Sequence, residues 1–162
     1  MSSLLRAIAR RFFRSMILVL LLTLLNSLIF PAATWATSSL GVTDNHLSSC
    51  PASDNCVVSQ NADTKHAIDP ISYHVDRKAA QEVLLKVLSV VPRTEVIEQT
   101  QDYIHALSKS RIFKFIDDVE FYFPTNESVI HVRSASRVGE SDLGVNRRRV
   151  EQIRLALKDL GI

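Results

Sequence analysis

Residues 129–157 read VIHVRSASRVGESDLGVNRRRVEQIRLAL, and this stretch decides the fold. Its first eight residues favour a strand, a polar loop framed by Gly139 and Gly144 follows, and the rest has the apolar period of a helix. The helix is expected to begin near Asn146. Its apolar face is Val150, Ile153, Leu157 and Leu160. The stretch therefore predicts one polar loop held between two rigid elements.

The same stretch holds the densest cluster of potential site residues in the chain. Loops set on rigid elements commonly carry function. The candidate binding residues are Arg133, Ser134, Ser136, Arg137, Ser141, Asp142, Asn146 and Arg147. This pattern indicates where a site lies, but it names no reaction and no catalytic residue.

Three consecutive arginines, residues 147–149, open the predicted helix. A helix N-terminus carries partial positive charge, so each cation there is unfavourable by about 0.3–1 kcal/mol unless an acid compensates. One explanation is internal pairing with Asp142, Glu151 or the acidic group at residues 117–120. The other is a bound anion. It would be seated on Ser141, the Gly144 backbone, Asn146 and Arg147.

The rest of the fold follows from the residues that precede this stretch. Strand-like runs cover residues 71–75, 94–100, 103–107, 112–123 and 129–136. Asp76 is placed as the N-cap of a helix that Pro92 ends. The order predicts an α+β domain over residues 69–162, an antiparallel sheet of four to five strands packed by two helices on one side. This β-α-β-β-β-β-α order is that of a helix-grip or TATA-binding-protein-like half-cup.

An acidic residue interrupts the apolar face of the run 112–123. The residues on that face by alternation are Phe113, Phe115, Val119, Phe121 and Phe123, and Asp117 falls among them. The simpler explanation is a bulge at Asp117 and Asp118 that shifts the phase. Otherwise Asp117 is a buried acid, and an inward-pointing Arg133 or Arg137 is its natural partner.

Residues 1–36 have the parts of a secretory signal. Four arginines precede a leucine-rich run from Met16 to Phe30, and small residues follow up to Ala36. We predict a signal peptide cleaved after Ala36, or an uncleaved anchor with residues 16–33 in the membrane. Without this leader, 15 basic residues face 17 acidic ones and the net charge becomes −2. A nucleic-acid partner is therefore not expected.

Residues 37–68 are rich in Ser, Asn, Asp and Thr and are expected to form an extended lead-in. Cys50 and Cys56 lie close together within it, and an exported chain favours a disulfide between them. The five histidines show no zinc spacing, so no metal or other cofactor is predicted. His105 and His131 are expected to be able to meet across strands near a serine.

Four segments of the chain resemble an uncharacterised family called domain of unknown function 1499. They are CPASDNCVVSQ at 50–60, YIHA at 103–106, FKFIDDVEFYF at 113–123 and VRSASRVGESDLGVNRRRVEQI at 132–153. The resemblance covers essentially everything after about residue 46. Glu140 and Leu107 depart from the family pattern, which favours an aromatic residue and an acid there. Similar proteins occur in bacteria, including cyanobacteria, and in plant plastids, so the resemblance implies the periplasm or the thylakoid lumen.

Together these patterns predict an exported, non-catalytic binding or assembly module. Its ligand would be a small apolar or anionic molecule in the half-cup, or its partner an envelope or photosynthetic protein. The alternative is an enzyme, in particular a hydrolase, that uses the loop Ser134–Arg147. Contact with a membrane is expected only through an uncleaved leader.

Overall fold

The computed structural model describes residues 13, 16, 39–112 and 114–162. The chain divides into two units, residues 1–36 and Thr37–Ile162. Almost all of the predicted leader lies outside the described residues, so its cleavage and its membrane insertion stay predictions. No helix among the described residues is long and apolar enough to cross a membrane.

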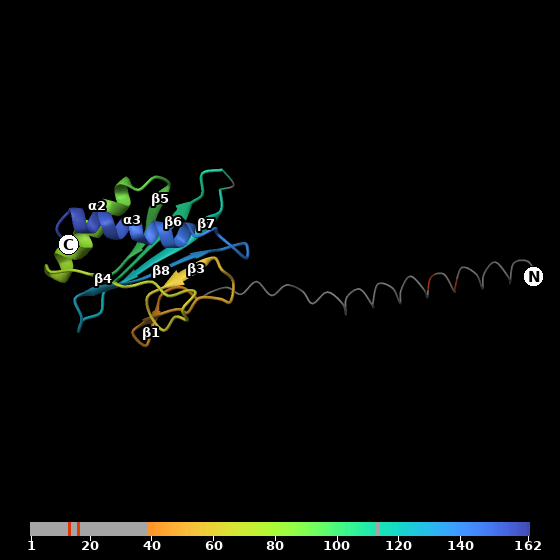
Figure 1. Cartoon of the computed structure of the whole chain (residues 1–162), viewed down its shortest axis with the longest axis horizontal. Coiled ribbons are helices and arrows are strands. Elements are labelled where there is room, and N and C mark those ends of the chain that lie inside the picture. Colours follow the sequence, from red (N-terminus) through yellow and green to blue (C-terminus); the bar gives the residue numbers. More distant parts are fainter. Residues whose placement is uncertain (1–12, 14–15, 17–38, 113) are drawn as a thin grey trace, which may run out of the picture. The chain divides into compact units, whose positions relative to one another are not determined.

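Within the described residues, an antiparallel sheet of six strands forms the centre of the second unit (Figure 1). The strands are β3 (Cys56–Val58), β4 (Ile71–Ser72), β5 (Thr94–Gln99), β6 (Tyr103–Lys109), β7 (Ile116–Tyr122) and β8 (Val129–Ser136). Their order across the sheet is β3-β8-β7-β6-β5, and β4 also pairs with β8. With α2 (Arg77–Val90) and α3 (Val145–Asp159), the elements from β4 onward follow the predicted order. The predicted α+β class is confirmed, with six strands in place of four or five.

Both helices pack on one face of the sheet. Helix α2 begins where predicted, because an oxygen of the Asp76 carboxylate accepts a hydrogen bond of 2.9 Å from the Ala79 N–H. The main hydrophobic core joins Leu84 and Leu88 of α2, Val150 and Leu157 of α3, and the sheet residues Phe121 and Val132. The face that a half-cup would offer to a ligand is therefore filled by helix side chains.

A second, smaller core lies on the opposite face. It contains Leu47, Val58, Tyr103 and Tyr122. The hairpin of β1 (Val42–Thr43) and β2 (His46–Leu47) contributes Leu47 to this core and turns at two residues with positive φ, Asp44 and Asn45. The described members of both cores lie between Val42 and Ile162, so the unit 37–162 has hydrophobic cores of its own.

The segment expected to be an extended lead-in contributes a strand to the main sheet. Residues Cys56, Val57 and Val58 are buried and pair with Ala135, Ser134 and Arg133 of β8. The start of the domain at residue 69 was therefore placed too late. The run contains only three apolar residues, too few to show a period.

The predicted bulge at Asp117 and Asp118 is wrong. Strand β7 pairs residue for residue with β6 and with β8 through both positions. The strand begins only at Ile116, and Phe115 before it is 49% exposed. At the C-terminus, Leu160 is the C-cap of α3 and is exposed, so it does not extend the apolar face of the helix as expected.

Candidate functional site

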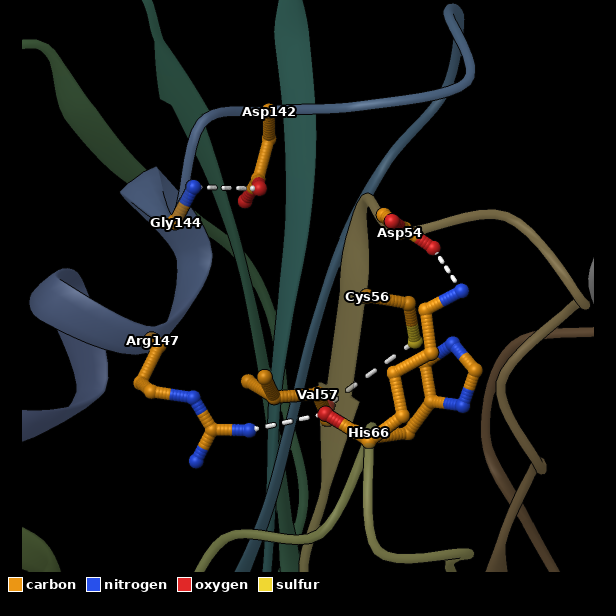
Figure 2. Close-up of a pocket in the computed structure, with 8 residues that line it drawn as sticks. Asp54, Cys56, Val57, His66, Asp142, Gly144 and Arg147 are labelled. Atoms are coloured by element: carbon orange, nitrogen blue, oxygen red, sulfur yellow. Dashed lines mark hydrogen bonds and ion pairs between the residues drawn. The ribbon is translucent and has the colours of Figure 1, made fainter.

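A small pocket lies between the start of α3 and strand β3 (Figure 2). Its volume is about 120 Å³. It is lined by Asp54, Cys56, Val57, Lys65, His66, Asp142, Gly144 and Arg147. The predicted disulfide between Cys50 and Cys56 is formed and anchors one wall, because Cys56 belongs to β3.

Asp142 caps the first turn of α3 and forms part of the pocket. Its two carboxylate oxygens accept hydrogen bonds from the N–H groups of Gly144, at 2.8 Å, and Asn146, at 2.6 Å. Gly144 has φ of +76°, and a Cβ at this position would lie 3.1 Å from Nη1 of Arg148. The acid that compensates the start of the helix is thus the internal Asp142.

The other walls come from residues 54–67. The Arg147 guanidinium donates to the carbonyls of Ala67, at 2.7 Å, and Lys65, at 3.1 Å. The Lys65 ammonium pairs with the Asp54 carboxylate. The buried ring of His66 lies between the Asp63 carboxylate and the Ser53 carbonyl. The hydrogen bond from His66 holds the pKa of the Asp63 carboxyl below its ordinary value.

A buried polar network joins α3 to the sheet beside this pocket. The Ser134 hydroxyl donates to the Asn146 side-chain carbonyl at 2.6 Å, and the Asn146 amide donates to the Ser136 hydroxyl at 3.0 Å. Arg149 donates to Ser134, to Asn146 and to the carboxylate of Asp117. Asp117 is 3% exposed, and its partner is Arg149 of α3, whereas Arg133 or Arg137 was expected.

Arg133 and Arg137 lie on the opposite face of the sheet because strand residues alternate between faces. Arg133 pairs with Glu120 at 2.7 Å, and both side chains are fully buried. Glu120 also accepts from the Tyr103 hydroxyl at 2.8 Å. Burial, and then the negative charge of Glu120, raise the pKa of Tyr103. Among the described residues, Nε and Nη2 of Arg133 have no hydrogen-bond partner.

A second charged cluster lies on the same face. Arg137 donates two hydrogen bonds to Asp118, of 2.9 and 2.8 Å, and Nε2 of His105 donates to the same carboxylate at 2.8 Å. Burial raises the pKa of Asp118, but these hydrogen bonds outweigh it and lower the pKa to about 2. The expected contact between His105 and His131 is not formed. His131 instead lies near the Ser59 hydroxyl and stacks on Tyr122.

The model of the family described as "Protein of unknown function (DUF1499)" matches residues 46–157. The chain belongs to this family. No curated protein and no solved structure matches the chain. The matched region contains the pocket, α2, the whole six-stranded sheet and all of α3 except its last two residues.

The structure separates the predicted site residues of this DUF1499 domain into three places. Asp142 and Arg147 line the pocket, and Ser141 lies next to it, where its backbone bridges to Asp54. The residues inside the network under α3 are Ser134, Ser136 and Asn146. Arg133 and Arg137 belong to the far face of the sheet.

Sequence reasoning missed four pocket residues, Asp54, Val57, Lys65 and His66, because they lie in the segment assigned to the lead-in. The only signal there was the cysteine pair, which holds residues 50–56 together. The described part of the DUF1499 domain holds no group of three or more His, Cys, Asp or Glu side chains able to bind a metal ion.

Proposed function

We propose that this DUF1499 domain is an exported, non-catalytic binding module whose pocket receives a small zwitterion of amino-acid size. The observation that carries the proposal is the charge distribution of the pocket. Asp142 and Asp54, which is paired with Lys65, lie toward one end of it and Arg147 lies toward the other (Figure 2). A ligand with one ammonium and one carboxylate group matches this arrangement.

The size of the pocket supports a small ligand. Pockets for drug-sized molecules measure roughly 300–1,000 Å³, whereas this one measures about 120 Å³. Half of the eight lining residues carry a charge, namely Asp54, Lys65, Asp142 and Arg147, and these groups favour a ligand with charged groups of its own. The sheet face under the helices is filled by Leu84, Leu88 and Val150, so it offers no support for the apolar ligand that the sequence had left open.

The donor capacity of Arg147 supports its role in binding. A guanidinium carries five N–H donors, and Arg147 uses two of its nitrogens on the carbonyls of Ala67 and Lys65. These two bonds fix the side chain, and the donors that remain are available to a carboxylate. Asp142, in contrast, is already engaged by two backbone N–H groups. The ammonium of the ligand would therefore bind to Asp54, whose carboxylate it would share with the Lys65 ammonium.

Export and the absence of catalysis are parts of the same proposal. The Cys50–Cys56 disulfide supports an oxidising compartment, and the periplasm and the thylakoid lumen both qualify. The enzyme alternative relied on the loop Ser134–Arg147. Ser134 has no exposed surface and its hydroxyl is held by Asn146 and Arg149, which argues against a nucleophile at this position.

The test is a calorimetric and NMR titration of the unit 37–162 with glycine, alanine, glutamate and lysine as separate probes. At least one probe should bind, and Arg147→Ala should weaken it about tenfold or more, since hydrogen bonds to charged groups contribute about 1.5–3 kcal/mol.

Arg154→Ala is the matched control for this titration. Arg154 also lies on α3 and donates to two backbone carbonyls, those of Asp69 and Pro70, but it does not line the pocket. It should retain the ligand at wild-type affinity. The proposed pocket would be overturned if the wild type bound none of the probes. It would also be overturned if Arg147→Ala and Arg154→Ala lost equal amounts of affinity.

A further inference from the structure

One end of the sheet presents a patch that neither the cores nor the pocket explain. The loop between β6 and β7 and the turn before β5 meet there, because Lys109 donates its N–H to the carbonyl of Arg93 at 3.0 Å. The loop closes on itself through Ser110 and Phe115. We call this surface the loop patch. It consists of Arg93, Lys109, Arg111, Ile112, Lys114 and Phe115, all exposed.

The loop patch is strongly basic in a domain that is otherwise slightly acidic. Residues 103–116 contain no acidic residue, and residues 37–162 as a whole carry a net charge of −2. Within the described part of the chain, no salt bridge involves the four cations of the patch, Arg93, Lys109, Arg111 and Lys114. All four residues are exposed, and Arg93 donates from Nε to the Lys109 carbonyl at 3.0 Å.

Large apolar side chains are exposed among these cations. Ile112 is 77% exposed and Phe115 is 49% exposed. The adjacent loop leaves the same end of the sheet, since the Arg137 N–H donates to the Ile116 carbonyl, and it adds Val138 at 40% exposure. Exposed apolar side chains that gather at one place commonly mark a binding surface.

We propose that the loop patch docks on the surface of an anionic lipid bilayer. Cations attract anionic headgroups, and apolar side chains between them enter the boundary between headgroups and acyl chains. A nucleic acid would satisfy the cations but would leave the aliphatic Ile112 in water. The contact is peripheral and belongs to the folded domain, whereas the sequence had predicted membrane contact only through the leader.

The backbone of the patch provides a variant that separates docking from folding. Lys114 has φ of +57°, a conformation that glycine adopts without the steric cost a side chain meets. Lys114→Gly should therefore leave the melting temperature unchanged or raise it, and it should still weaken docking. A purely structural role of Lys114 would produce the opposite pattern.

The experiment is flotation of the unit 37–162 with vesicles of phosphatidylcholine alone or of phosphatidylcholine mixed with phosphatidylglycerol. The unit should float only with the anionic vesicles, and high salt should release it. Lys114→Gly and Arg111→Ala should each lower the affinity roughly fivefold, the effect of one basic residue at an anionic surface. Ile112→Ser should weaken binding without changing its salt dependence.

The control removes the same charge from the other end of the domain. Lys78→Ala, at the start of α2, and Lys158→Ala, at the end of α3, should float as the wild type does. Equal losses in the control and patch variants would show that only net charge matters and would overturn the proposal. Equal flotation with neutral vesicles, or no flotation at all, would also overturn the proposal. A third contrary result would be tight binding of an RNA oligonucleotide that the patch variants abolish, together with no binding to vesicles.

Discussion

Asp118 is the residue whose ionisation the fold controls most clearly. It is 4% exposed, yet two hydrogen bonds from Arg137 and one contact with His105 surround its carboxylate. Burial disfavours the charged form, and the three partners favour it more strongly, so the pKa falls from 3.8 to about 2. The folded state therefore binds a proton at Asp118 less readily than the unfolded state does.

This depressed pKa predicts how stability depends on pH. The contribution of Asp118 is complete above about pH 4 and is lost as the pH falls through about 2, and it amounts to about 2 kcal/mol. Asp118→Asn should remove this part of the acid dependence. Urea denaturation of both proteins between pH 7 and pH 2 measures it. If the difference in unfolding free energy between them stayed constant over this range, the ionised Asp118 would not be a source of stability.

The buried ion pair between Arg149 and Asp117 holds helix α3 on the sheet. Arg149 reaches from its first turn to Asp117 at the start of β7, and both side chains are almost fully buried. Its other hydrogen bonds, to Ser134 and Asn146, complete the contact between helix and sheet. The helix is therefore docked by polar contacts at its N-terminal end and by the apolar residues Val150, Ile153 and Leu157 along its length.

Removing Arg149 should undock this end of α3. Arg149→Ala leaves Asp117 buried without its cation, and breaking a buried ion pair in this way costs roughly 3–5 kcal/mol. Arg148→Ala is the matched control, because its exposed side chain donates only to the Leu143 carbonyl, and it should cost less than about 1 kcal/mol. Denaturant unfolding gives both values. Similar losses in the two variants would mean that the Asp117 pair contributes little.

The sequence predicted the elements well because their signals are local. Strand β8 has the predicted bounds, and α2 begins after the Asp76 cap. The contacts between elements were harder to predict. The polar Asp117 on an apolar face suggested a bulge, but its cation lies 32 residues away on α3, and spacing along one strand contains no information about that distance. The pocket could not be predicted for the same reason: its residues are far apart in the sequence, and Lys65 and Arg147 meet only after β3 pairs with β8.

At the scale of the whole molecule, the leader and the disulfide can be tested together. Protein recovered from the exported fraction of its own cells should have a mass that begins at Thr37, because the predicted signal ends at Ala36. The mass should also be lighter by two hydrogens, because Cys50 and Cys56 are bonded. Native mass spectrometry without reductant measures both. A full-length mass would contradict cleavage, and free thiols would contradict the disulfide.

The pairing order of the strands has a consequence for the time course of folding. Strands β3 and β4, the first two strands of the six-stranded sheet along the chain, both lie beside β8, which is made last. A nascent chain that ends before Val129 offers neither of them a neighbour. Pairing across such long separations is slow, so the sheet closes only after synthesis is nearly complete. Until then β3 and β4 stay unpaired, which would suit a chain that is exported unfolded, if the predicted leader directs it to such a route.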